Sequence, residues 1–533
     1  MNQRFKTFST KYGLYVLILI LLPPALLINL GLMPFIDDEA IRALVALEMK
    51  WTGHYLTPTL HAAPYLNKPP LFNWMLIGMS YLTGENTEWN ARFTNVFALG
   101  SFGLITMWVY QRIYDLRTGI IIALMVMTSG RILFWDAMLG LIDITFSVVI
   151  FSLFATVYFT VKQQRWLTLF LGSYFLCAVG FLLKGLPALV FQGVTLSVWL
   201  LWTRHYRKLL SWEHVVGLGL FILTLGGYYG LYLSQEGTPD VFARLLHEST
   251  KRTVIESGGW KVIKHIFTFP VELIYHFLPW PILTIYFFRR QAVAWAYRDP
   301  FWVFQGIIMI SNILVYWISP DIFPRYLFMF LPLFFSMLFR LDGWHQSAQT
   351  PHHRIIRFIF HWFMIFVAVS VWIPLFLDRL STVDYCGLKV GITAGAMALI
   401  LVYVFKFNAN LMLAVVATLL IIRLSFNWFV LPDRLAHDYG QLCRQQAIEI
   451  GHQLKNQNLV VFGDTEVQPT TSFYLTHSFA TIIPRQYNPL NQHNLYIVDT
   501  LLYPHLIWEQ IDTLPMRHFH KTLLVGRFVQ LRK

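Results

Sequence analysis

Three consecutive acids, Asp37, Asp38 and Glu39, follow the first long apolar run of the chain. Such a triplet most often stabilises the start of a helix through the helix dipole. Adjacent residues at a helix start point in different directions, so one carboxylate can face a cavity while another caps the helix. A carboxylate beside a pocket is suited to act as a general base. We therefore name Asp38 and Glu39 as candidate catalytic residues.

A second pair of acids, Asp136 and Asp143, lies in the hydrophobic connection FWDAMLGLID. Ionisable residues are costly in such apolar surroundings, and those present are often functional. From the sequence, a structural role and a functional role of these two acids are equally well supported. Asp143 joins the candidate catalytic residues.

Three cations stand beside proline or glycine, which restrict or define the local backbone: Lys68 before two prolines, Lys184 before Gly185, and Arg325 after Pro324. One interpretation is that they bind a phosphate. The other is that they extend to the membrane boundary and anchor helix ends.

An expected helix within residues 234–269 carries four further polar side chains: His247, Glu248, Lys251 and Arg252. We expect Arg252 to join the phosphate-binding cations. His247 and Glu248 are candidates for contact with an acceptor or a metal.

The composition indicates a membrane protein. Only 13% of the residues are charged and 56% are hydrophobic, with a mean hydropathy of +0.53, whereas a soluble domain carries about 25% charged residues. The net charge of +13 fits basic loops against an anionic cytoplasmic leaflet better than it fits nucleic acid.

Apolar runs of about 17–25 residues predict membrane-spanning helices. We expect about thirteen, near residues 12–33, 91–111, 118–135, 142–161, 166–183, 185–203, 212–233, 270–288, 300–318, 326–340, 355–377, 387–406 and 411–430. The first of them is expected to be retained rather than cleaved as a signal peptide.

The orientation follows from the basic residues. With the N-terminus inside, seventeen lysines and arginines fall in the short inner segments and five in the short outer ones. This bias predicts that residues 34–90, 234–269 and 431–533 lie outside the cytoplasm. Within the first of these loops, residues 38–51 suit a helix on the membrane surface, with Ala40, Leu44, Leu47 and Trp51 on one face. Residues 70–83 predict a second surface helix or a re-entrant piece.

The composition changes after Val430, and residues 431–533 predict a small α/β domain outside the cytoplasm. Helical stretches are expected near 436–455 and 469–477, and strands at 459–462, 495–498 and 522–525. The domain carries no chemical motif, and we expect it to dock or to position an acceptor. Cys386 and Cys443 could pair if both lie outside the cytoplasm, although two free thiols are the favoured alternative.

The chain resembles the C-type membrane glycosyltransferases, in the branch that contains the lipid A aminoarabinose transferase and the protein O-mannosyltransferases. The resemblance covers residues 10–430 and is carried by six short motifs in register: Asp38-Glu39, Lys68-Pro69, Asp143, Lys184-Gly185, His247-Glu248 and Pro324-Arg325-Tyr326. The aminoarabinose transferase also has a small C-terminal α/β domain.

The resemblance implies an all-α polytopic fold and an inverting transfer of a sugar from a polyprenyl-phosphate carrier. The acceptor would be lipid A, another envelope glycan or a protein, at the outer face of the cytoplasmic membrane. It implies that Asp38 is the base and that Lys68, Lys184, Arg325 and Tyr326 bind the carrier phosphate. The related transferase has an acid before the Lys-Pro pair, where this chain has Asn67, so a divalent metal and the identity of the donor sugar are left open.

Two other classes of function remain. A transporter or flippase for a lipid-linked sugar would need ionisable or broken-helix sites near the middle of the membrane, where the predicted spans are nearly free of charge. A scaffold for the C-terminal domain would not need two structured outer loops. We expect membrane lipids, the lipid-linked donor and an acceptor as partners, and no nucleic acid.

Overall fold

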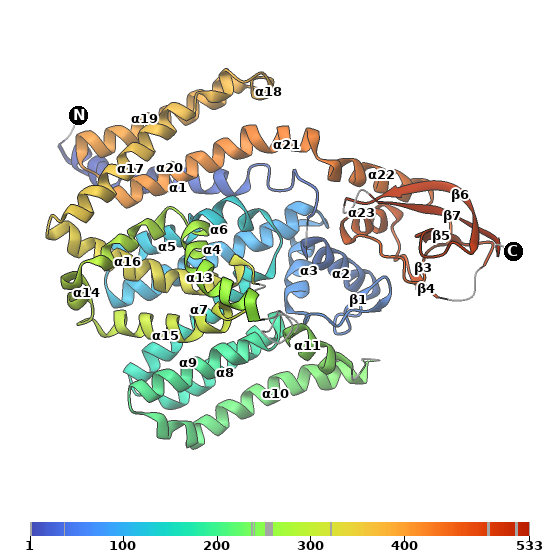
Figure 1. Cartoon of the computed structure of the whole chain (residues 1–533), viewed down its shortest axis with the longest axis horizontal. Helices are drawn as coiled ribbons and strands as arrows, with labels where there is room; N and C mark the ends of the chain where they lie inside the picture. The colour runs from blue at the N-terminus through green and yellow to red at the C-terminus, as the bar shows by residue number, and fades with distance from the viewer. Residues whose placement is uncertain are drawn as a thin grey trace.

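The computed structural model describes residues 3–36, 38–235, 238, 240–250, 259–319, 322–487, 491–517 and 521–531. A large bundle of helices carries a small domain of strands and two helices at one end (Figure 1). The predicted fold class, an all-α polytopic membrane protein with a small C-terminal α/β domain, is confirmed.

Within the described ranges, nine helical stretches are long and apolar enough to cross a membrane, and a bent pair makes a tenth. They are Glu88–Ile113 (α4), the pair Leu116–Met127 (α5) and Gly130–Met138 (α6, Gly130–Phe134, with η1, Asp136–Met138), Ile142–Lys162 (α7), Trp166–Lys184 (α8), Trp212–Ser234 (α10), Pro300–Trp317 (α15), Pro324–Ser347 (η4, Pro324–Phe330, with α16, Leu331–Ser347), Pro351–Leu375 (α17, Pro351–Ser370, with η5, Ile373–Leu375), Cys386–Phe407 (α19) and Leu411–His437 (α20, Leu411–Ser425, with η6, Phe426–Val430, and α21, Leu431–His437).

Two shorter apolar helices also match predicted spans, Tyr12–Leu27 of α1 (Gln3–Leu27) and α9 (Pro187–Trp202). The prediction at 270–288 is the exception. There α13 (Gly259–His276) ends and a 3₁₀ segment, η3 (Trp280–Phe288), follows, so no continuous span forms. The remaining short elements are β1 (Thr59–Leu60), β2 (Ala63–Pro64), η2 (Tyr206–Leu210), α11 (Asp240–Thr250), α14 (Arg290–Ala296) and α18 (Asp378–Ser381).

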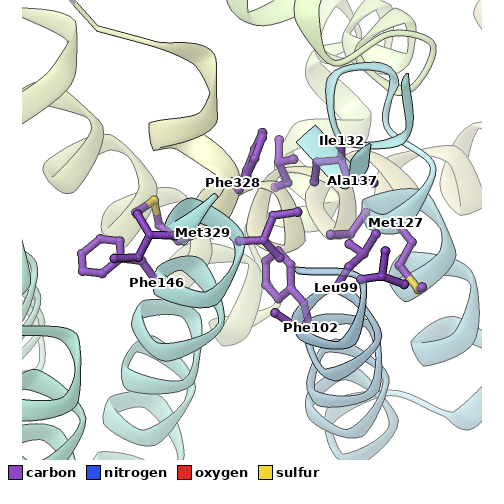
Figure 2. Packing of buried hydrophobic residues seen from close by; sticks show 14 of the residues in the cluster. Leu99, Phe102, Met127, Ile132, Ala137, Phe146, Phe328 and Met329 are labelled. Carbon is purple, nitrogen blue, oxygen red and sulfur yellow. The ribbon is translucent and has the colours of Figure 1, made fainter. Parts of the chain in front are cut away.

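The core of the bundle fixes the segment that carries Arg325. Figure 2 shows Met127, Ile132 and Ala137 of the bent pair packed with residues of α4, α7 and η4. Phe328 and Met329 of η4 are fully buried in this cluster. Close van der Waals packing of such side chains is what holds helices together inside a membrane. The first turn of η4 is therefore held firmly at the end of the bundle.

The first and the last predicted spans are joined by polar contacts inside the bundle. The guanidinium of Arg423 and the side-chain amide of Asn427 both donate hydrogen bonds to the carbonyl of Ala25, at 3.2 and 2.9 Å. Asn29 returns a hydrogen bond to the carbonyl of Asn427, at 2.8 Å. These bonds fix the exit of α1, from which the chain continues to Asp38.

The predicted helix at 38–51 is present as α2 (Asp38–Thr52), but it does not lie exposed on the membrane surface. Most of its residues are buried, because α2 packs between α3 (Leu71–Thr83) and α23 (Pro469–Phe479) of the C-terminal domain. Leu44 and Leu47 face this packing, whereas Trp51 stays exposed. The prediction took the apolar face of α2 for a membrane contact because the covering helix is about 430 residues away in sequence, and helical periodicity does not identify the partner.

The C-terminal domain contains every predicted element: α22 (Tyr439–Gln453), α23, β3 (Leu459–Phe462), β5 (Leu495–Val498) and β7 (Thr522–Leu531). The structure adds β4 (Arg485–Gln486) and β6 (Leu506–Pro515), and the sheet order is β4-β3-β5-β7-β6. The β3–β4 and β3–β5 pairs are parallel, and the β5–β7 and β6–β7 pairs are antiparallel. The strand β6 was not predicted, because this edge strand is largely polar and exposed in its middle. Cys177, Cys386 and Cys443 are all free, as the favoured alternative predicted.

The C-terminal domain docks on the first long loop through buried polar groups. The Nδ1 atom of His61 lies 3.1 Å from the carbonyl of Ile483, and its Nε2 atom lies 2.9 Å from the hydroxyl of Ser472. A neutral imidazole can form both hydrogen bonds, because its Nδ1 atom donates and its Nε2 atom accepts. Nearby, the hydroxyl of Tyr474 donates to Glu88 and accepts from the backbone of Phe35.

We predict that docking of the C-terminal domain weakens as the pH falls from about 6.5 to about 4. Burial lowers the pKa of His61 from 6.5 to about 4, so in this window the undocked state binds a proton that the docked state excludes. The docked state keeps its full stability above pH 6.5 and loses about 3 kcal/mol by pH 4, at about 1.4 kcal/mol per pKa unit. Hydrogen exchange of residues 459–486 as a function of pH measures this.

His61→Gln should remove most of that pH dependence, whereas His54→Gln, at an exposed position of the same loop, should keep it. Buried Glu48 acts in the opposite direction, because burial raises the pKa of its carboxyl, and it is present in all three proteins. Equal pH dependence in the His61→Gln protein and its parent would contradict this role.

Candidate functional site

A cavity of about 750 Å³ is lined by residues of α2, which packs against the C-terminal domain, of the first long loop, and of α7, α8, α9, α15 and η4. Its lining contains a cluster of polar residues, here called the polar end, and many apolar residues. The polar end contains the predicted residues Asp38, Lys68, Asp143, Lys184, Arg325 and Tyr326, joined by Arg42, Tyr65 and Asn67. Five separate segments of the chain therefore bring their polar side chains into one space.

A buried carboxylate organises the cations of the polar end. Asp143 lies in the first turn of α7, and its Oδ1 atom is 2.5 Å from the Nζ atom of Lys184, in the last turn of α8. An acid at a helix start and a base at a helix end are each favoured by the helix dipole. The Oδ2 atom of Asp143 lies 3.3 Å from the Nε atom of Arg325. Asp143 thus forms ion pairs with two cations.

Arg325 lies between the two acids of the cavity. It follows Pro324 at the start of η4, and its side chain is only 4% exposed. Besides Asp143, its Nη2 atom contacts the Oδ2 atom of Asp38 at 3.2 Å. The side chain of Asp38 is 51% exposed. Asp38 is therefore the carboxylate that a molecule in the cavity can reach.

Aromatic rings support the cations from the side. The Nζ atom of Lys184 lies 3.9 Å from the ring centroid of Tyr326, and the guanidinium of Arg325 lies 4.4 Å from that of Phe323. A cation over a ring face is stabilised by about 0.5–2 kcal/mol. These contacts hold the two positive charges at fixed places without neutralising them.

The sequence interpretation missed Arg42 and Tyr65. Arg42 stands one turn after Asp38 on α2 and is buried, with its guanidinium 5.5 Å from the ring centroid of Tyr65. Residues four apart on a helix share a face. The spacing from Asp38 could therefore have identified Arg42, whereas nothing in the local sequence marks Tyr65.

Glu39 does not line this cavity, so its expected catalytic role is not supported. Its side chain is fully buried and forms an ion pair with Arg92 of α4, at 2.8 Å. It also accepts hydrogen bonds from the backbone of Ile36 and of Gly140, both at 2.8 Å. One residue along a helix turns the side chain by about 100°. Asp38 therefore faces the cavity while Glu39 caps and anchors α2.

Of the predicted residues of the second loop, His247 is the one whose side chain the structure describes. His247 is exposed on α11 and is absent from the cavity lining. The side chain of Glu248 and all of Arg252 fall outside the described residues. Within the described ranges, no group of three or more histidines, cysteines and acids is placed to hold a metal. The acids of the cavity contact cations instead.

Much of the apolar lining comes from α9 and α15 and their first and last turns, and we call this surface the α9–α15 groove. It is lined by Leu186, Pro187, Val190 and Phe191 on one side and by Leu314, Val315, Tyr316 and Ile318 on the other. Val190 and Leu314 are exposed, on helices that are apolar enough for a membrane. The cavity thus joins a cationic pocket to a hydrocarbon-lined groove, the two parts that an anionic lipid headgroup and its chain require.

Known proteins share this fold. ArnT of Cupriavidus metallidurans, in a crystal structure bound to undecaprenyl phosphate, superposes over 97% of this chain and 98% of its own, with a TM-score of 0.70 at 18% identity. Residues 67–226 match the dolichyl-phosphate-mannose-protein mannosyltransferase family. The resemblance to the C-type membrane glycosyltransferases is confirmed at the level of the fold.

Curated sequences match over shorter stretches. An uncharacterized protein of Aquifex aeolicus is 26% identical over 58% of this chain and 61% of its own length. The undecaprenyl phosphate-α-4-amino-4-deoxy-L-arabinose arabinosyl transferase 2 of Pseudomonas fluorescens is 24% identical over 55% of this chain and 53% of its own length. The chain thus spans less than two thirds of these relatives.

We predict that Asp143→Asn lowers the free energy of unfolding by about 3 kcal/mol, because it leaves two buried cations without their shared partner. Lys184→Met should cost less, since Asp143 keeps Arg325. The double variant Asp143→Asn/Lys184→Met should be more stable than Asp143→Asn alone. Thermal unfolding of the purified protein in detergent, without lipid substrate, ranks the three.

Asp433→Asn is the matched control, because its partner His437 is exposed and exposed pairs contribute about 0–1 kcal/mol. A Lys184→Met protein less stable than Asp143→Asn would contradict the central place given to Asp143.

Proposed function

We propose that this protein is an inverting glycosyltransferase that moves a sugar from a polyprenyl-phosphate carrier to an acceptor. One observation carries the proposal. Two rigidly held cations, Lys184 and Arg325, and a half-exposed carboxylate, Asp38, meet at the head of an apolar groove. The fold shared with ArnT supports the same conclusion.

The donor headgroup fits the polar end. Lys184, Arg325 and Lys68 neutralise the carrier phosphate, which is the leaving group, and Tyr326 keeps Lys184 in place. The α9–α15 groove takes the first part of the polyprenyl chain. Charge that develops on the departing phosphate is stabilised by groups already in position, which costs no reorganisation.

Asp38 serves as the base. The acceptor hydroxyl or phosphate oxygen attacks the anomeric carbon from the face opposite the carrier, and a new carbon–oxygen bond forms. The bond from that carbon to the carrier phosphate oxygen breaks, and any acceptor proton passes to Asp38. Attack from the opposite face inverts the configuration. Asp143 is buried between its two cations, so we assign it a positioning role.

The sugar and the acceptor are narrower proposals. Relatives named for transfer of 4-amino-4-deoxy-L-arabinose from undecaprenyl phosphate favour a pentosyl donor of that type, whereas the matched family is named for mannose transfer to protein. We favour a lipid acceptor of the cell envelope, such as lipid A, over a protein.

We further propose that the cavity and the C-terminal domain face the outer side of the cytoplasmic membrane. The seventeen-to-five distribution of basic residues supports this orientation. In it, both the carrier phosphate and the acceptor meet at the outer boundary of the membrane, where α2 and α3 lie beneath the C-terminal domain (Figure 1).

Asp38→Asn should lower the turnover number by about 10²–10⁴-fold, because an amide cannot accept the proton of the acceptor. Binding of the donor should persist, since Arg325 and Lys184 remain. Transfer from radiolabelled polyprenyl-phosphate sugar in proteoliposomes measures turnover, and Glu85→Gln, at an exposed position, serves as the control. Near-normal turnover in the Asp38→Asn protein would remove Asp38 from the mechanism.

Arg325→Lys should weaken donor binding by about 10-fold or more, which is about 1.4 kcal/mol. Lysine keeps the charge but cannot present a planar fork to the phosphate and Asp143 together. Calorimetric titration with undecaprenyl phosphate measures the affinity. Arg298→Lys, at an exposed position, should bind like the parent. Unchanged affinity in the Arg325→Lys protein would mean that Arg325 is an anchor rather than a phosphate ligand.

A further inference from the structure

A second cavity, of about 440 Å³, lies behind the first and shares no lining residue with it. Ile36 lines the second cavity and Asp38 the first, just as Leu139 lines the second and Leu141 the first. The two spaces are therefore back to back, on either side of the segments that carry these residues. The Glu39–Arg92 ion pair, with its bond from Gly140, holds these segments together.

The second cavity gathers arginines from three distant parts of the chain. Arg379 comes from α18, Arg434 from α21, and Arg517 from the segment after β6 in the C-terminal domain. Arg517 pairs with Asp438 at 3.0 Å. Among the residues that the structure describes, no carboxylate lies within ion-pair distance of Arg379 or Arg434. With Arg92, the described lining holds four arginines against two carboxylates, Asp433 and Asp438, so the cavity keeps a surplus of positive charge.

The other polar residues of the lining are Asn29, Arg92, which pairs with Glu39, and Asp433, which pairs with His437. The apolar part of the lining includes Leu30, Met33 and Pro34 at the exit of α1, together with Met138, Leu139 and Leu431. Trp135 is exposed at this site, with the guanidinium of Arg131 5.5 Å from its ring centroid. Tryptophan is enriched at the boundary between membrane and water. Guanidinium groups over apolar walls at such a boundary match an anionic amphiphile better than a free ion.

We propose that this cavity binds the phosphate headgroup of a membrane lipid other than the glycosyl donor. Guanidinium groups of α18 and α21 contact the phosphate, and the apolar walls contact the glycerol region and the first part of the chains. Because Arg517 lines the same space, the bound headgroup also lies against the C-terminal domain and joins it to the membrane helices. The site does not depend on the proposed transferase activity.

Binding of lipids to the whole protein, measured by native mass spectrometry in detergent, tests this proposal. The probes are phosphatidylglycerol, zwitterionic phosphatidylcholine and inorganic phosphate. We expect phosphatidylglycerol to bind more tightly than phosphatidylcholine, and Arg379→Gln/Arg434→Gln to weaken that binding about 10-fold. Arg298→Gln/Arg357→Gln removes the same charge at exposed positions elsewhere and should bind like the parent.

The donor cavity is unchanged in both double variants, so any phosphatidylglycerol bound there contributes equally and cancels in the comparison. Equal loss in both double variants would overturn the proposal, because net charge alone would then explain the binding. Unchanged binding in Arg379→Gln/Arg434→Gln would overturn it as well. Inorganic phosphate that binds as tightly as phosphatidylglycerol would also overturn it, since the apolar walls would then contribute nothing.

Discussion

The buried carboxylate of Asp143 is the constraint on which the donor cavity depends. Two cations cannot be kept side by side in an apolar bundle without a counter-charge, and Asp143 supplies it to both Lys184 and Arg325. It does so from the start of α7, so three segments must meet at one point. An incoming phosphate adds a second counter-charge to a cation pair that is already assembled, which limits the cost of ordering side chains on binding.

A second ion pair fixes the position of Asp38, the proposed base. Glu39 and Arg92 tie the start of α2 to α4 and, through Gly140, to the connection before α7. Asp38 is the adjacent residue, so the direction of its side chain is set by the burial of Glu39. The C-terminal domain covers α2 from the other side. Its docking therefore supports the end of the bundle that carries the cavity, although none of the residues described in that domain lines the cavity.

Much of this arrangement could be predicted from the sequence. The remaining features could not be predicted, for physical reasons. Six candidate residues meet in the cavity. Lys68, Lys184 and Arg325 could be identified as charges beside proline or glycine, and Asp143 as a charge in an apolar connection, because such charges are rare. The sequence could not tell Asp38 from Glu39, because only the tertiary partner Arg92 decides which one is buried. Tyr65 was missed because an isolated aromatic residue carries no signal, and the cover over α2 was missed because it comes from the far end of the chain.

The most direct test of this account is a cryo-electron microscopy structure of the protein saturated with undecaprenyl phosphate. The account predicts that the phosphate lies within hydrogen-bonding distance of the Nζ atom of Lys184 and the guanidinium of Arg325. It also predicts that the polyprenyl chain follows the α9–α15 groove. A phosphate bound away from both cations, or a chain that leaves the α9–α15 groove empty, would contradict it.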